Sequence, residues 1–273
     1  MLNNIDTNNF ISETLKNDNS IFIGRSGIIE LRSCFFYSKY KSLPSQLLYL
    51  LKNNAGVYGD KIIEFFEEYL NAISLADLNV YWVQEDLKET QNYLYDTYSP
   101  SCIRFENRGV EPYYFNSPWS QYLENKKVLI IHPFKQSIDS QYVKKKLLWN
   151  NNTLPDFQEL LTYQSIQSIG DSGPHSSWIE SLNIMKQEIE RLDFDIALIG
   201  CGAYGMPLGA HIKSKMKKRA IHMGGALQIL FGIKGYRWDN HDEISKLYNQ
   251  YWIRPLETEK PKAYKTVEQG CYW

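Results

Sequence analysis

Three glycines follow a short apolar run near residue 200 and form the pattern Gly200-x-Gly202-x-x-Gly205. Glycines at this spacing let a strand turn tightly into a helix, and they let the backbone approach a ligand closely. The free amides at the start of such a helix favour a phosphate group. The pattern therefore predicts a phosphate-binding turn at residues 200–205.

Two other residues inside this turn could take part in chemistry or binding. Cys201 could be a nucleophile, but its small size in a tight turn explains it better. Tyr204 could stack on a base or a sugar, or it could simply pack against the core.

A second glycine pair, Gly224-Gly225, follows the next apolar run, which contains His222. Two such turns on neighbouring strands suit a nucleotide diphosphate better than a single anion. A dinucleotide-dependent oxidoreductase using NAD or FAD is an alternative, but it needs an acid at the end of its second strand to bond the ribose. Here the nearest acid downstream is Asp239. Tight packing between helix and strand is another explanation of the glycines.

The elements that must position these turns alternate between strand-like and helix-like segments. Apolar runs predict strands at 21–24, 78–84, 102–105, 126–133, 160–168, 195–200 and 219–223. Apolar periodicity predicts helices at 27–37, 59–75, 138–149 and 206–216, and Ser177-x-x-Glu180 can form the capping box of a further helix. This alternation predicts an α/β fold, Rossmann-like, with a mostly parallel sheet and helices on both faces.

We expect residues 1–273 to form a single α/β domain. The segment 91–120 is rich in Tyr, Pro and Asn and predicts an irregular connection between an N-terminal half and a Rossmann-like C-terminal half. The tail after residue 250 is aromatic and is expected to pack over the body of the protein. Asp171 and His175 flank a predicted helix start, where a loop or capping role is the preferred interpretation.

Composition limits the function classes. Thirty basic and thirty-one acidic residues give a formal charge of −1, without the positive excess that non-specific nucleic-acid binding requires. The four cysteines have no metal-ligand spacing and no disulfide framework, which favours a reducing compartment. The N-terminus lacks the apolar core of a signal peptide, and no apolar run approaches the roughly 18 residues of a membrane helix. We expect a cytoplasmic protein, with peripheral membrane association left open.

The segment DIALIGCGAYGMPLGAHIK, followed by AIHMGGALQILFGIKGYRW, resembles proteins encoded in bacterial surface-polysaccharide loci. These look like distant relatives of the GT-D fold glycosyltransferases. FIGRSGIIEL, KKVLIIHPF and EQGCYW extend the resemblance over most of the chain. It implies a GT-D-like core, a nucleotide-sugar donor, and a saccharide or lipid-linked saccharide acceptor in capsule or O-antigen type polysaccharide synthesis.

The GT-D transferases carry an Arg-x-Gly-Asp-x-Glu turn whose two acids are implicated in divalent metal and donor binding. The matching stretch keeps Arg25, Gly27 and Glu30, but Ile28 stands where the Asp should be. One carboxylate is a poor site for a hard dication, so a requirement for Mn²⁺ or Mg²⁺ is doubtful and Glu30 is the only candidate ligand. The missing acid also supports an alternative function as a non-catalytic nucleotide-binding subunit of an assembly complex.

Glycosyl transfer needs stabilisation of the charge on the departing diphosphate and, for inversion, a base for the acceptor hydroxyl. The candidate bases are Glu30, His132 and His222, each predicted at a strand end or in the turn after it. The candidate donor-binding residues belong to the two glycine turns and the segments around them: Arg25, Gly27, Gly200, Cys201, Gly202, Tyr204, Gly205, Gly224, Gly225, Gln228 and Arg237.

Overall fold

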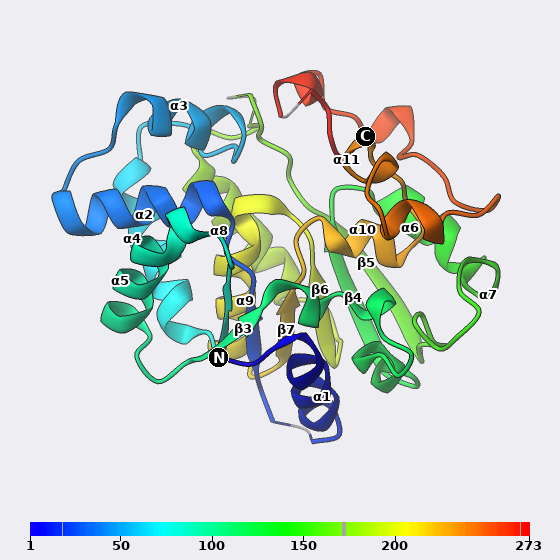
Figure 1. The fold of residues 1–273 in the computed structure, drawn as a ribbon. Coiled ribbons are helices and arrows are strands. Elements are labelled where there is room, and N and C mark those ends of the chain that lie inside the picture. The colour runs from blue at the N-terminus through cyan, green and yellow to red at the C-terminus, as the bar shows by residue number, and fades with distance from the viewer. Residues whose placement is uncertain (18, 171–172, 268) are drawn as a thin grey trace.

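Seven parallel strands form one sheet at the centre of the protein (Figure 1). The computed structural model describes residues 1–17, 19–170, 173–267 and 269–273, so Asp171 lies outside the described residues. The strands are β1 (Phe22–Gly24), β2 (Leu78–Tyr81), β3 (Ile103–Glu106), β4 (Lys127–His132), β5 (Glu159–Gln164), β6 (Ile196–Ile199) and β7 (Arg219–His222). Their order across the sheet is β3-β2-β1-β7-β6-β4-β5, and every neighbouring pair is parallel. Strands from both halves of the chain therefore share one sheet.

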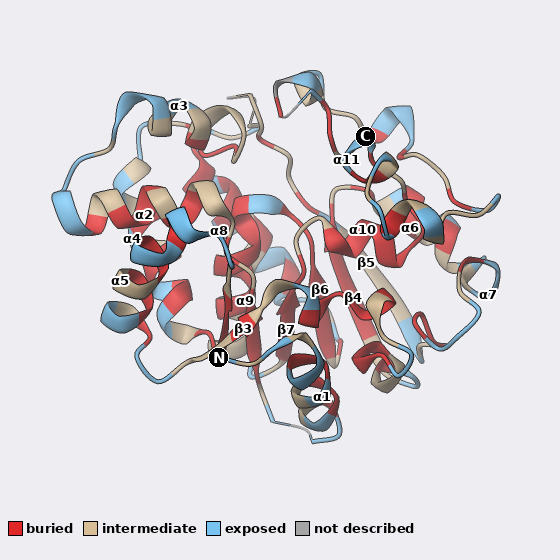
Figure 2. Cartoon of the chain, viewed as in Figure 1, coloured by how far each residue is buried: buried red, intermediate tan, exposed pale blue. Residues whose placement is uncertain are grey.

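Helices cover both faces of the sheet, as predicted (Figures 1 and 2). One face packs against α2 (Ile28–Tyr40), α4 (Ile62–Leu75), α5 (Lys88–Tyr98), α8 (Trp178–Ile189) and α9 (Gly205–Ser214), with α3 (Ser45–Asn53) packed on α2. The other face packs against α1 (Asn4–Leu15), α6 (Lys135–Tyr142), α7 (Lys145–Leu148), α10 (Ala226–Leu230) and α11 (Tyr236–Asp239).

The strands are continuous apolar runs because successive side chains point to opposite faces of the sheet and both faces are buried. In β4, Leu129 and Ile131 join the core on one face, whereas Val128 and Ile130 join the core on the other. A strand buried on both sides loses the apolar–polar alternation of a half-exposed strand. The predicted strands are therefore present, although several are shorter than their apolar runs.

Two helical predictions differ from the structure. The segment predicted as irregular from residue 91 begins inside α5, where Leu94 and Tyr95 are fully buried. This helix was missed because polar groups also anchor it: the amide of Gln91 exchanges hydrogen bonds of 2.7 and 3.0 Å with the backbone of Trp82. The predicted helix 138–149 is divided into α6 and α7.

The predicted capping box is half formed. Ser177 Oγ accepts a hydrogen bond from the amide of Glu180 at 3.2 Å, but the carboxylate of Glu180 accepts from the amide of Ser176 instead of Ser177. His175 Nδ1 lies 2.8 Å from Ser181 Oγ within the first turns of α8, in line with a local structural role. In the described part of the chain, no helix is both long and apolar enough to span a membrane.

The order of the strands creates a crevice at the carboxyl ends of β4 and β6. The connection after β4 leads through α6 to the edge strand β5, whereas the connection after β6 leads through α9 toward β7 at the centre. Adjacent parallel strands whose connections diverge in this way form the switch point at which open α/β sheets bind ligands. His132 ends β4 and Gly200 follows β6, so both lie at this point.

Candidate active site

A cavity of about 320 Å³ opens at this edge of the sheet. Its volume lies at the lower end of the range of about 300–1,000 Å³ that is usual for small-molecule sites. The structure brings nearly all of the sequence-predicted residues to its wall: Arg25, Gly27, Glu30, His132, Gly200, Cys201, Gly202, Tyr204, His222, Gly224, Gly225, Gln228 and Arg237. Gly205 is not part of the wall and lies beneath His222.

The backbone amides of the first glycine turn are available to a ligand. Gly200 N donates to Ile131 O at 2.9 Å, and Gly205 N donates to Gly202 O. The amides of Cys201, Gly202 and Ala203 between them donate to no acceptor in the described part of the chain. Cys201 and Gly202 line the cavity, so their two consecutive amides without a protein acceptor form a site for water or an anion.

The second glycine turn adds amides beside the first. Gly224 N donates to Ile199 O, whereas the amides of Gly225 and Ala226 have no acceptor within the described ranges. Since β6 and β7 are adjacent, the two turns lie next to each other at the same edge. Together they suit a ligand with two linked phosphates.

Two other helix starts at this edge are already occupied by the protein's own carboxylates. Glu259, which is buried, accepts hydrogen bonds from the amides of Gln136 and Ser137 at 2.7 and 3.1 Å, at the start of α6. The carboxylate of Glu30 folds back over Gly27 at the start of α2. A helix N-terminus stabilises negative charge, so an internal carboxylate there excludes an external anion. No carboxylate of the described residues accepts a hydrogen bond from the amides of the two glycine turns.

The glycines of the two turns are required for different reasons. A Cβ on Gly205 would lie 2.2 Å from His222 Nε2, and one on Gly225 would lie 2.7 Å from the ring of Tyr272. Tight packing therefore accounts for these two. Gly202, in contrast, has φ +58° and no atom within 4 Å of the position of a Cβ. It opens directly into the cavity.

Among the described residues, Glu30 has the only carboxylate side chain on the cavity wall. It is the third residue of α2, and burial raises its pKa above the usual value, while a hydrogen bond from its own amide acts in the opposite direction. A general base works best when its pKa lies near the working pH. The burial of Glu30 therefore moves its carboxylate toward that condition.

Burial raises the pKa of Glu30 but lowers the pKa values of the two histidines. It lowers the pKa of His132 to about 3. It does the same for His222, where the nearby Arg25 guanidinium adds to the effect. Both imidazoles are therefore neutral at physiological pH and are weak bases there. Since Nδ1 of His132 accepts from the amide of Phe134 at 3.0 Å, its proton sits on Nε2, which makes this group a hydrogen-bond donor.

His222 is the more unusual of the two. Neither ring nitrogen has a hydrogen-bond partner among the described residues, although the side chain is buried and lines the cavity. A buried polar group without a partner costs free energy, and such groups cluster where a ligand completes them. His222 is therefore suited to hydrogen-bonding a ligand rather than to removing a proton.

The buried histidines predict a loss of stability in mild acid. Their pKa values are lower in the folded than in the unfolded state, so protonation favours the unfolded state. The stability that the neutral histidines contribute is complete above pH 6.5 and is lost as the pH falls toward about 3. Each should lower the free energy of unfolding by at most about 1.4 kcal/mol per pH unit in that window. Denaturant unfolding of the wild type and of a His132→Asn, His222→Gln variant between pH 7 and 4 measures this. The variant should have a shallower slope, and an equal slope would contradict the assignment.

Arg25 is held by a buried polar network that sequence patterns did not indicate. Its guanidinium contacts Glu111 Oε1 at 3.1 Å and Met223 O at 2.5 Å, and Nε bonds Asn107 Oδ1. Tyr113 also donates to Glu111, at 2.9 Å. Glu111 follows the edge strand β3 and belongs to no recognisable sequence motif. The network fixes Arg25 against the end of β7, beside Gly224.

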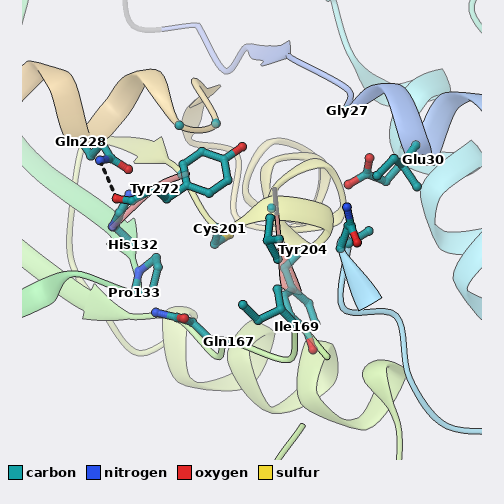
Figure 3. A pocket seen from close by; sticks show the side chains of 18 of the residues that line it. Gly27, Glu30, His132, Pro133, Gln167, Ile169, Cys201, Tyr204, Gln228 and Tyr272 are labelled. Carbon is teal, nitrogen blue, oxygen red and sulfur yellow. Dashed lines mark hydrogen bonds between the residues drawn. The ribbon is translucent and has the colours of Figure 1, made fainter. Parts of the chain in front are cut away.

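Several predicted donor-binding side chains also have structural partners. The amide nitrogen of Gln228 donates to Ile233 O and to Tyr272 O (Figure 3). Arg237 Nη1 donates to the Tyr272 hydroxyl at 2.9 Å. These contacts attach the C-terminal tail to α10 and α11. The tail packs over the body as expected, and it supplies Val267, Tyr272 and Trp273 to the cavity wall. The sequence pointed to this segment only through the resemblance of EQGCYW, and nothing in it placed these residues beside the glycine turns, more than 40 positions earlier.

Tyr204 and Cys201 both line the cavity and also have structural roles. Tyr204 stacks on Trp178 with centroids 4.8 Å apart, and its hydroxyl lies 2.9 Å from Ser168 Oγ, so it packs as a core residue at the base of the cavity. Burial raises the pKa of the Cys201 thiol, which disfavours the thiolate that a nucleophile requires. Cys201 therefore contributes its backbone and its small size to the turn.

The side chains that the structure describes at this site do not fit a divalent metal. A hard dication requires several oxygen ligands, but Ile28 adds an apolar surface beside Glu30, and Glu111 is engaged with Arg25. No group of three His, Cys, Asp or Glu side chains suited to a metal occurs within the described ranges.

Comparison with protein families gives one match. Residues 119–230 match the family model described as a GT-D fold-like domain. The matched segment contains β4 to β7 and both glycine turns, and it confirms the GT-D resemblance for this part of the chain. It begins after Glu30, so the correspondence of Arg25, Gly27 and Glu30 to the acidic turn of the GT-D transferases stays a prediction. Neither the curated proteins nor the solved structures gave a match.

Proposed function

We propose that this chain is a glycosyltransferase that takes a sugar from a nucleotide-sugar donor during the assembly of a bacterial surface polysaccharide. The observation that carries the proposal is the pair of amides at Cys201 and Gly202, which line the cavity at the switch point of a GT-D fold-like sheet and have no acceptor among the described residues. A saccharide or a lipid-linked saccharide is the proposed acceptor.

In this proposal the two glycine turns bind the donor diphosphate. The amides of the first turn and those of Gly225 and Ala226 offset the negative charge that grows as the bond to the sugar breaks. His132 Nε2 and His222 are neutral and would donate hydrogen bonds to oxygen atoms of the donor. The fixed guanidinium of Arg25 adds positive charge at the end of β7.

Glu30 is the proposed base of an inverting reaction. Its carboxylate would take the proton of the acceptor hydroxyl while that oxygen forms a bond to the anomeric carbon and the diphosphate departs with the bonding electrons. The raised pKa of Glu30 favours this role over the two histidines.

The alternative functions make different predictions. A nicotinamide-dependent oxidoreductase would need an acid at the end of β7, where the chain has His222, Met223 and Gly224. A non-catalytic nucleotide-binding subunit would use the same glycine turns, so only turnover distinguishes it from a transferase. Detectable donor hydrolysis or sugar transfer would exclude it.

The binding prediction is tested with Gly202→Ala. The new methyl group meets no protein atom, so the stability cost is restricted to the left-handed backbone and should be about 1–2 kcal/mol. The methyl would stand in the path of the diphosphate and should weaken nucleoside diphosphate binding at least about tenfold, which is about 1.4 kcal/mol.

Calorimetric titration with UDP, GDP, CDP and dTDP measures this effect. Gly59→Ala is the control, since Gly59 also has positive φ but lies outside the cavity. The control should lose stability while retaining affinity. If no nucleoside diphosphate binds the wild type, the proposed function is wrong.

A further inference from the structure

The cavity has two different ends. Figure 3 shows Gly27 and Glu30 on one side, Cys201 and Tyr204 between, and His132, Gln228 and Tyr272 on the other side. A nucleotide sugar is linear, with the sugar and the nucleoside on opposite sides of the diphosphate. If the diphosphate lies on the turn at Cys201 and the sugar faces Glu30, the nucleoside must extend toward Tyr272.

That second end is built from aromatic rings. Phe134 and Trp273 meet edge to face with centroids 6.1 Å apart, and Tyr272 meets Trp273 at 5.9 Å and 88°. All three line the cavity, and Phe134 and Trp273 are almost fully buried. Rings of this kind bind the flat face of a nucleobase with little dependence on its identity.

The same end also offers hydrogen-bonding groups. Trp273 is 5% exposed, and its Nε1–H has no acceptor among the described residues. Other buried indoles share this property, but Trp273 is the one of them that lines the cavity. Gln167 Oε1 is likewise unpartnered, while its amide nitrogen donates to Glu259 O at 3.2 Å. A donor and an acceptor that line the same cavity suit the edge of a nucleobase, which carries both.

Hydrogen bonds hold Cys271 and Tyr272 in place beside the cavity. Gln228 donates to Tyr272 O at 3.1 Å, and the amide of Arg237 donates to Cys271 O at 2.9 Å. Gln228 and Arg237 come shortly after the second glycine turn in the sequence, so these hydrogen bonds connect the tail to the segment that carries the amides of that turn. The absence of a Cβ at Gly225 lets the Tyr272 ring approach the turn.

We propose that Tyr272 and Trp273, together with Phe134 and Gln167, form the nucleobase subsite of the donor pocket. This inference rests on the proposed function, since it takes the ligand to be a nucleotide sugar. It makes the C-terminal tail, and not the glycine turns, the part of the protein that distinguishes a nucleoside diphosphate from pyrophosphate.

The test compares inorganic pyrophosphate with UDP, GDP, CDP and dTDP by calorimetric titration. The wild type should bind at least one of the nucleotides about tenfold or more tightly than pyrophosphate. Trp273→Leu should lose about tenfold in affinity for that nucleotide and remain within about twofold for pyrophosphate. Trp273→Phe, which retains a ring but lacks the N–H, should lose less.

Tyr264→Leu is the matched control, because Tyr264 packs on Trp273 with centroids 5.8 Å apart but does not line the cavity. It should leave both affinities within about twofold of the wild type. Equal losses for pyrophosphate and nucleotide in Trp273→Leu, or a similar loss in Tyr264→Leu, would overturn the subsite. So would a wild type that binds pyrophosphate and all the nucleotides equally, although the proposed function would then survive. Failure of every nucleoside diphosphate to bind would instead refute the proposed function.

Discussion

Glu30→Gln should reduce the rate of sugar transfer by about 10²–10⁴-fold, the usual contribution of a general base. Glutamine has nearly the same shape as glutamate, so donor binding should change little. Burial raises the pKa of Glu30, so its ionised form is disfavoured by the fold and contributes no stability at neutral pH. The variant should therefore be at least as stable as the wild type at pH 7.

The transfer assay uses the nucleotide sugar whose nucleoside diphosphate binds most tightly, and denaturant unfolding provides the stability. Glu30→Asp keeps a carboxylate and should retain more activity than Glu30→Gln. Retention of more than about a tenth of wild-type activity by Glu30→Gln would exclude this carboxylate as the base.

Glu111→Ala should cause the largest loss of stability, about 3–5 kcal/mol, because it leaves the Arg25 guanidinium buried without its counter-charge. The side chains of Arg25 and Glu111 are 15% and 8% exposed, so solvent screens this pair little. Donor affinity should fall as well, since Arg25 also holds Met223 O beside the second glycine turn.

The exposed ion pair between Arg32 and Asp86 is the matched control, with side chains 41% and 64% exposed. Asp86→Ala should change the free energy of unfolding by less than about 1 kcal/mol. A double-mutant cycle of Arg25→Met and Glu111→Leu should give a coupling of about 1–3 kcal/mol in denaturant unfolding. Additive effects would show that the two groups do not stabilise each other.

Local patterns were sufficient to predict the sheet and most of one cavity wall. The glycine turns were recognisable because glycine is required there for two reasons. Gly202 adopts a positive φ, and Gly205 has no room for a Cβ against His222. The residues at the ends of β1, β4 and β7 came together because parallel strands place their carboxyl ends at one edge of the sheet. These signals lie within a few residues of one another in the sequence.

The remainder of the site depends on contacts between distant segments. Glu111 meets Arg25 across 86 positions, and Trp273 reaches Phe134 from the end of the chain. No local periodicity encodes such pairings. The chemical roles also depend on burial, since the sequence offers Glu30, His132 and His222 as candidate bases and only their environments distinguish the carboxylate from the two neutral histidines.

The central claim, that the amides of Cys201 and Gly202 bind the donor diphosphate, is tested most directly by nuclear magnetic resonance. Saturating ¹⁵N-labelled protein with its tightest-binding nucleoside diphosphate should shift the amide resonances of Cys201 and Gly202. Inorganic pyrophosphate should shift the same two resonances. If the ligand saturates the protein while these amides keep their positions, the diphosphate binds elsewhere and the account is wrong.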